Sequence, residues 1–582
     1  MTRMKHSLRA HWAALCMAAV VAAAVAFPQI YFRIDHADDG VYQGVELLPD
    51  NPWSPRVREI MDGNGFGSIY YKDGKDDPYL FQPLGSMTVA YMGKAFGLEV
   101  NNTLLLSRSL LAGAAFLLIY AFAFLLSRDR LAALAGAPAL LFADAAMSYS
   151  GVKQILNGIS PSSFLNIGQP VNPAMIYIPL FAFLAAFWLF YRKRQYRWGV
   201  ASAILLGLNF YIYFYSWTYL YAFGGLLALL FLLRGNWREA VRVGSVFAGA
   251  LLVAIPYGIN LYRSSQYATF ADVGVRMGIV QTHAPLFVGL TVLIALGIFL
   301  ILFPREDAEK RLFWFALLLA PFITLNQQIL TGKEMQAAHY HWYFHKPMAV
   351  LFLIVTAFYL LGRFQSGRYR QAFAALLVAG SIAVGAFIQY ASYFRGGEDG
   401  GAMAISRQRY GPVLNWLNQH AAREEVVLAN DPVSHHVAIY TPLNVAYHRA
   451  GYASLSATRE RLLDTIFIFY RIRGVSSGDA ERVFFAEREF ISWNLYGLYY
   501  RQLSGSYEAI PDEEIRDIAS RYRATFSTLA PEWLEKKLAD YSVNYVVWDK
   551  KADPDWRVSN YGFLKESAVY GDIIIYRFNQ QS

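Results

Sequence analysis

The chain has 582 residues, of which 55% are hydrophobic and 16% are charged, whereas about 25% of the residues of an ordinary soluble domain are charged. This composition excludes an ordinary soluble protein and places the apolar excess in membrane spans. The net charge of +9 is interpreted as cationic loops beside anionic lipid, and we expect no nucleic-acid partner because the sequence contains no folded basic module.

The N-terminus carries Arg3, Lys5 and Arg9 before an apolar run, as a signal peptide does. The run from Trp12 to Phe32 is about 20 residues long, which is enough to cross a bilayer, and further apolar runs follow it. We therefore predict an uncleaved first span. It contains Cys16, the only cysteine, which excludes an internal disulfide and a cysteine-based zinc cluster.

Other windows of roughly 17–25 apolar residues predict further spans. The charge-free stretch 198–233 is too long for one crossing of a ~30 Å hydrocarbon core, so it is predicted as two short spans with a turn near Tyr215–Trp217. The sequence thus predicts a polytopic α-helical membrane protein with about 11 transmembrane helices, near residues 12–32, 104–127, 130–147, 174–191, 198–214, 217–233, 243–262, 284–303, 312–330, 347–362 and 371–393.

Lysine and arginine lie mainly in every second segment between these windows. Such segments face the cytoplasm under the positive-inside rule. The short segments on the other side are poor in positive charge and hold only Lys153, Arg263, Arg276, Lys333 and Lys346. We therefore predict a multi-pass protein of the plasma membrane (the inner membrane of a bacterium), with a cytoplasmic N-terminus and an extracytoplasmic C-terminal domain.

The chain divides into a membrane part and a C-terminal part at a glycine-rich segment. Three apolar runs in the C-terminal part predict buried strands, Glu425–Ala429, Asn544–Trp548 and Asp572–Tyr576. Helical patterns alternate with them, which indicates a small α/β domain. The predicted domains are a transmembrane catalytic domain over 1–395 with its first external loop at 33–103, a linker at 396–404, and a soluble α/β domain at 405–582.

Two adjacent carboxylates, Asp38 and Asp39, follow the first span directly, so they are expected at the outer membrane surface. A carboxylate there can act as a general base, and the pair can bind a divalent cation such as Mg²⁺ or Mn²⁺. The alternative interpretation is a solvated polar cap on the end of a helix.

Further along the first loop, Gln82-Pro83-Leu84 leads into an amphipathic stretch, Ser86–Phe96. This pattern is typical of a helix lying in the plane of the membrane interface. Gly97 is predicted to end it.

The acidic pair after the first span, the long first external loop, the Pro-Leu-led interfacial helix ending in Phe-Gly and the arginine in the second span, Arg108, together resemble the GT-C superfamily of membrane glycosyltransferases. Within it, the chain is most similar to bacterial relatives of the protein O-mannosyltransferase and aminoarabinose transferase group. The resemblance implies a sugar donor carried on polyprenyl phosphate or pyrophosphate and chemistry on the outer face. It assigns the catalytic base or metal contact to the first-loop acidic motif, here Asp38 with Asp39 as its partner.

The resemblance covers about 390 residues as architecture, but only the Asp38 and Gln82–Gly97 segments as motif. The loop has Gln82-Pro83-Leu84 where many relatives have a Lys-Pro-Pro-type element. The Trp-Trp-Asp-Tyr-Gly signature of oligosaccharyltransferases is absent, which argues against transfer of a whole glycan.

A second outer segment, 326–346, combines cations, amides and aromatic rings, which a transferase needs for a lipid phosphate and a sugar. Its aromatic residues are equally explained by an interfacial belt. His339, His341 and His345 have a spacing that also permits a metal site, although HxHxxxH is not a specific signature. The predicted substrate-binding residues are Arg108, Arg263, Arg276, Lys333, Glu334, His339, His341, His345, Lys346 and Gln82.

These observations lead to the hypothesis of an inverting glycosyl transfer at the outer leaflet, in which Asp38 is the general base and no cofactor is required. The acceptor is left open as a protein, a lipid or a polysaccharide. Two alternatives remain. A transporter or flippase of envelope glycolipids would need a polar path through the bilayer. A non-catalytic scaffold would act through its external C-terminal domain.

Overall fold

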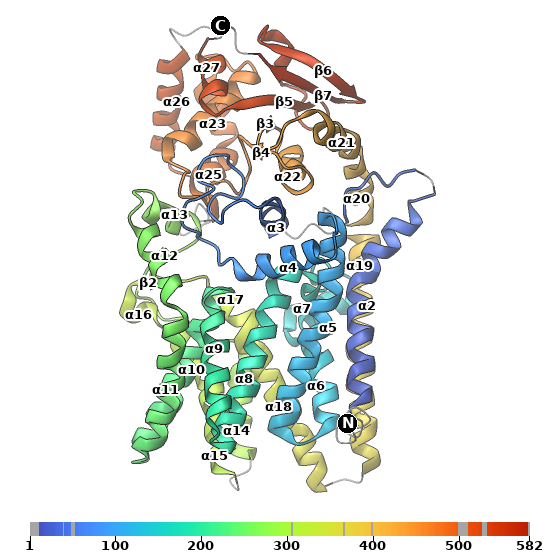
Figure 1. The fold of residues 1–582 in the computed structure, drawn as a ribbon, viewed down its shortest axis with the longest axis vertical. Helices are drawn as coiled ribbons and strands as arrows, with labels where there is room; N and C mark the ends of the chain where they lie inside the picture. Colours follow the sequence, from blue (N-terminus) through green and yellow to red (C-terminus); the bar gives the residue numbers. More distant parts are fainter. Residues whose placement is uncertain are drawn as a thin grey trace.

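A computed structural model describes residues 11–38, 40–47, 53–303, 307–364, 367–396, 400–498, 510–526 and 532–579. The long helices run side by side, and the C-terminal part lies above one end of this bundle (Figure 1). The first helix, α2 (Trp12–Asp35), begins at the opposite end of the bundle.

Seven helical segments of the described residues are long and apolar enough to cross a membrane, so the chain is a multi-pass membrane protein. An eighth candidate is the pair α11 (Trp237–Val253) and α12 (Ile255–Ser265), bent by 56° at the break between them. Four of the seven are single helices, namely α2, α5 (Val100–Ser127), α10 (Phe214–Leu233) and α19 (Gly367–Arg395). The other three are the segments Pro170–Lys193, Ala308–Thr331 and Ala337–Arg363. The first of these contains α8 (Met175–Lys193), the second α15 (Ala308–Thr324) and α16 (Gln328–Thr331), and the third α17 (Ala337–Tyr340), η4 (His341–His345) and most of α18 (Lys346–Phe364).

Each of the eleven predicted windows contains a helix, but three of these helices are short. They are α6 (Arg130–Phe142), α9 (Tyr196–Asn209) and α14 (Leu290–Leu302). At 1.5 Å per residue, a helix of 13 or 14 residues is only about 20 Å long, which is less than the ~30 Å hydrocarbon core. The described residues therefore hold seven or eight helices of spanning length. The predicted break in 198–233 is present, but it falls between Asn209 and Phe214, slightly before the expected turn.

The first loop contains α3 (Trp53–Asp62) and α4 (Leu84–Ala95). As predicted for an interfacial helix, α4 runs across the top of the vertical helices (Figure 1). It ends before Gly97, whose φ of +63° is the left-handed conformation that glycine adopts without strain. Phe96 is 65% exposed on the protein surface, as expected for a side chain that faces lipid headgroups.

Shorter elements connect the bundle on the side of the C-terminal part. They are η1 (Ala145–Met147), α7 (Tyr149–Leu156), η2 (Asn166–Gly168), η3 (Pro170–Ala174), α13 (Phe270–Arg276), and the strands β1 (Val280–Gln281) and β2 (Lys333–Glu334), which pair antiparallel.

The C-terminal part is built on a five-stranded mixed sheet of order β4-β3-β5-β7-β6. The three predicted strands are confirmed as β3, β5 and β7, whereas β4 and β6 carry no continuous apolar signal. Apolar clusters cover both faces of the sheet, which explains why every residue of β3 is buried. The strands are β3 (Val426–Ala429), β4 (Asn444–Val445), β5 (Val543–Asp549), β6 (Leu564–Tyr570) and β7 (Ile573–Phe578).

Helices surround this sheet. They are α20 (Gly401–Arg407), η5 (Gln408–Tyr410), α21 (Gly411–His420), α22 (Asp431–Tyr440), α23 (Arg459–Ile472), α24 (Ala480–Ala486), α25 (Arg488–Tyr496), α26 (Asp512–Phe526), α27 (Glu532–Asp540) and η7 (Val558–Asn560). Of the segment predicted as a linker, 396–404, residues 401–404 belong to α20, and residues 397–399 are outside the described ranges.

The first loop is packed into the C-terminal part rather than lying free over the bundle. The carbonyl of Tyr70 accepts a hydrogen bond of 2.9 Å from the backbone N–H of Val445 in β4, and Tyr70 and Tyr71 belong to the apolar core of the sheet. The side chain of Gln408 bonds to the backbone of Gln43 and Val45. The C-terminal part therefore fixes the conformation of the loop that carries the acidic motif.

Two buried histidines of this region predict an acid-sensitive stability. His436 is 3% exposed and His448 7%, and burial holds the pKa of both well below the ordinary value. Below about pH 6.5 only the unfolded chain takes up these protons, so stability is full above that pH and falls as the pH drops. The expected loss is about 1.4 kcal/mol per histidine per pH unit.

Thermal unfolding measured between about pH 7 and pH 5 tests this prediction. His436→Phe is expected to lower the slope of the unfolding free energy against pH by the contribution of one proton. A stability that does not change with pH in this range would contradict it.

Candidate active site

The acidic motif follows the last turn of α2. Asp38 is exposed in the turn after the helix, where a carboxylate is accessible to an acceptor from outside. Asp39 lies outside the described residues. Asp35, three residues before Asp38, is also exposed and lies 3.9 Å from His36.

Directly after this turn, the first loop buries a second carboxylate, Glu46, which is 3% exposed. Its Oε1 accepts a hydrogen bond of 2.9 Å from the hydroxyl of Tyr42 and a shorter one from Arg33 at the end of α2. Arg108 of α5 is 3% exposed and also attracts this carboxylate electrostatically. Burial raises the pKa of Glu46, and Arg33 opposes that shift. In the sequence, Glu46 is marked only as a charge between two apolar residues, Val45 and Leu47.

Backbone hydrogen bonds hold the loop around Glu46 in place. The N–H of Glu46 donates to the Tyr440 hydroxyl at 3.1 Å, and the N–H of Leu47 donates to Oε1 of Gln29 in α2 at 3.0 Å. The segment after Asp38 is thus bonded to both the bundle and the C-terminal part.

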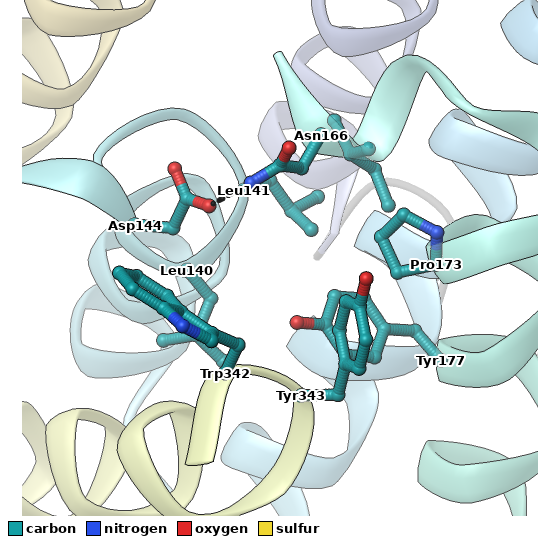
Figure 2. A pocket seen from close by; sticks show the side chains of 9 residues that line it. Leu140, Leu141, Asp144, Asn166, Pro173, Tyr177, Trp342 and Tyr343 are labelled. Atoms are coloured by element: carbon teal, nitrogen blue, oxygen red, sulfur yellow. Dashed lines mark hydrogen bonds between the residues drawn. The ribbon is translucent and has the colours of Figure 1, made fainter. Parts of the chain in front are cut away.

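A small cavity lies at the same end of the bundle (Figure 2). Asp144 follows α6, and its Oδ2 accepts a hydrogen bond of 3.0 Å from the amide of Asn166 in η2. The volume of about 20 Å³ accommodates a single water molecule and no sugar ring. The lining residues are Leu140, Leu141, Asp144, Asn166, Ile167, Pro173, Tyr177, Trp342 and Tyr343.

Lys346, the first residue of α18, is a buried charged group close to Asp144. It is 1% exposed, its Nζ lies 4.0 Å from the centroid of the Trp342 ring, and Asp144 attracts it electrostatically. Among the described residues, Nζ has no hydrogen-bond acceptor. A buried ammonium without an acceptor is costly, so this group is well suited to receive an anion.

The three histidines of the second outer segment do not converge. His339 bonds to the Tyr213 hydroxyl, His345 bonds through Nε2 to Thr324 Oγ1 at 2.9 Å, and the ring of His341 packs against Gly289. Within the described ranges, no group of three His, Cys, Asp or Glu side chains is arranged to hold a metal ion. His339 belongs to α17, whereas His341 and His345 are the first and last residues of the π-helical turn η4, and each of the three side chains contacts a different neighbour.

Comparison with known proteins shows what this architecture resembles. No protein-family model and no curated protein sequence matches the chain. Among solved structures, it is similar to the oligosaccharyltransferase of Archaeoglobus fulgidus tethered with an acceptor peptide, at 12% identity over 99% of this chain and 74% of that one, with a TM-score of 0.50. It is also similar to the mycobacterial arabinofuranosyltransferase AftD, at 13% identity over 97% of this chain and 40% of that one, with a TM-score of 0.51. The chain has a GT-C-like fold.

A third similar structure is ArnT from Cupriavidus metallidurans bound to undecaprenyl phosphate, at 12% identity over 96% of this chain and 97% of that one, with a TM-score of 0.48. The fold assignment rests on the first two structures.

Within the GT-C-like fold, the other predicted substrate-binding residues fall into separate places. Gln82 is half-buried before α4, and Arg263 is exposed near the end of α12. Lys333 and Glu334 form β2, in which Lys333 is exposed and burial raises the pKa of Glu334. Arg276 is 5% exposed, and its Nη1 donates a 2.6 Å hydrogen bond to the Ala457 carbonyl of the C-terminal part. The fold therefore uses Arg276 to hold α13 against that part.

Proposed function

We propose that the protein is a glycosyltransferase that moves a sugar from a polyprenyl-phosphate-linked donor to an acceptor at the outer face of the plasma membrane. The GT-C-like fold supports this proposal, and the two similar structures that define the fold are an oligosaccharyltransferase and an arabinofuranosyltransferase. The single observation that carries it is the buried ammonium of Lys346 beside Asp144, at the end of the bundle covered by the C-terminal part.

The orientation follows from the distribution of charge. The end of α8 and the starts of α11 and α19 lie away from the C-terminal part (Figure 1). They carry Arg192, Arg242 and Arg370, in the basic segments that the positive-inside rule assigns to the cytoplasm. The N-terminus is then cytoplasmic, and Asp38, Lys346 and the C-terminal part are outside. The acceptor remains a protein, a lipid or a polysaccharide.

In the proposed reaction, Asp38 removes the proton from an acceptor hydroxyl or amine, and the acceptor atom attacks the anomeric carbon of the sugar. The bond from that carbon to the phosphate oxygen breaks, and the lipid phosphate leaves with the electron pair. Lys346 and Arg108 stabilise the leaving charge. A divalent cation, if bound at Asp38 and Asp39, would supply further charge stabilisation.

The donor-binding step is tested by Lys346→Met. This substitution removes the ammonium and keeps an unbranched apolar chain over Trp342. A hydrogen bond to a charged group contributes about 1.5–3 kcal/mol, so the Kd for polyprenyl phosphate is expected to rise roughly 10- to 150-fold. A thermal-shift titration with polyprenyl phosphate measures the change.

The matched control is Lys153→Met, which changes an exposed lysine of α7 at the same end of the bundle. It is expected to bind the lipid as the unaltered protein does. Equal affinity in the Lys346 and Lys153 variants would remove Lys346 from the donor site.

A further inference from the structure

A second cavity lies at the other end of the helix bundle from Lys346. It is an open pocket lined by the last turns of α5 and α18 and the first turns of α6, α15 and α19, and its volume is about 690 Å³. Val355 and Phe358 of α18 are buried in its apolar wall, at 3% and 1% exposure. A volume of this size accommodates a ligand well beyond a few water molecules.

The polar lining of this cavity is strongly basic. The lining contains one carboxylate, Asp129, and five basic residues, Arg128, Arg130, Lys310, Arg363 and Arg370. Asp129 is fully engaged, because Oδ1 accepts from the backbone N–H groups of Leu131 and Ala132 at the start of α6 and Oδ2 pairs with Arg370. The lining thus carries five basic side chains and one carboxylate, and Asp307, which attracts Lys310 electrostatically, lies outside it.

We propose that this cavity binds the phosphate of an anionic phospholipid headgroup. The cations lie at the ends of membrane spans, which is where headgroup phosphates are found, and guanidinium groups match the oxygens of a phosphate. The apolar wall beside them fits the glycerol end of an acyl chain. Basic pockets between helices on the cytoplasmic side recognise anionic headgroups in this way. The site is independent of the proposed glycosyl transfer.

The test is lipid binding to the purified full-length protein. Native mass spectrometry or thermal unfolding is measured with added phosphatidylglycerol, phosphatidylcholine or inorganic phosphate. The unaltered protein is expected to bind phosphatidylglycerol in preference to the other two. Arg128→Gln combined with Arg363→Gln is expected to weaken phosphatidylglycerol binding about tenfold or more, because each basic group near an anionic surface contributes on the order of 1 kcal/mol.

The matched control is Arg234→Gln combined with Arg238→Gln. It removes the same charge from exposed arginines near the linked ends of α10 and α11, outside the cavity, and should retain lipid binding. An equal loss of phosphatidylglycerol binding in both double variants would show that only the net charge of the protein matters, and it would contradict the proposed site. Equal binding of phosphatidylcholine by the unaltered protein would also overturn it. Stabilisation by inorganic phosphate without phosphatidylglycerol would assign the cavity to a soluble anion instead. These comparisons on the unaltered protein decide the matter even if the glutamine variant fails to fold.

Discussion

Asp38→Asn is expected to lower the rate of sugar transfer by roughly 10²- to 10⁴-fold, the contribution of a general base, while binding of polyprenyl phosphate is retained. The substitution keeps the size and polarity of an exposed side chain, so the fold should not change. Transfer from a polyprenyl-phosphate sugar to an acceptor, assayed with purified protein, measures the rate.

Asp35→Asn is the control for this variant. It removes an exposed carboxylate from the end of the same helix, three residues away, and should leave transfer close to that of the unaltered protein. If the Asp38 variant keeps its activity, the base must be a different group. If both variants lose transfer activity to the same extent, the loss is caused by the reduced negative charge at the end of α2 and not by removal of a general base.

Glu46→Ala is expected to destabilise the protein by about 1.5–3 kcal/mol, because the half-buried Arg33 loses a hydrogen bond to a charged group and the buried Arg108 loses a carboxylate that attracts it. The hydroxyl of Tyr42 also loses its acceptor. The change should appear as a lower unfolding temperature in detergent, and the segment that follows Asp38 should become more sensitive to protease.

Two further variants separate this effect from a general loss of charge. Glu99→Ala removes an exposed carboxylate at the start of α5, whose side chain makes no capping hydrogen bond, and should have little effect. Combining Glu46→Ala with Arg33→Met should recover part of the lost stability, because the cation that has lost its carboxylate is then replaced by an apolar side chain. Equal stability of the Glu46 and Glu99 variants would show that the Arg33–Glu46 pair is not a structural contact.

The buried cluster around Glu46 links the membrane part to the C-terminal part. Glu46 bonds through its side chain to α2 and through its backbone to Tyr440 of α22. Tyr70 of the first loop accepts a backbone hydrogen bond from Val445 of β4 in the C-terminal part. The C-terminal part is therefore a structural support for the loop that carries Asp38, whatever it contributes to acceptor binding.

The sequence was sufficient for features that depend on neighbouring residues. Hydropathy located a helix in every predicted window, the break within 198–233 and the three most apolar strands, and amphipathic spacing with Gly97 located α4. These signals are local because lipid and a buried sheet select side chains segment by segment. Helix length was predicted less well. A hydropathy window does not show where a helix ends within an apolar run. The helix α6 ends before the turn that Asp144 caps, and α9 ends at Asn209, although the residues that follow each helix are still apolar.

The tertiary structure alone decided which distant residues meet. It paired Glu46 with Arg33 and brought Arg108 near enough to attract the same carboxylate. It also placed the ammonium of Lys346 beside Trp342, where Asp144 attracts it, and bonded Arg276 to the C-terminal part. The three closely spaced histidines contact three different neighbours. The physical reason is that a buried charge is stabilised by whichever partner the packing of helices brings within a few ångströms, and that partner has no fixed distance along the chain.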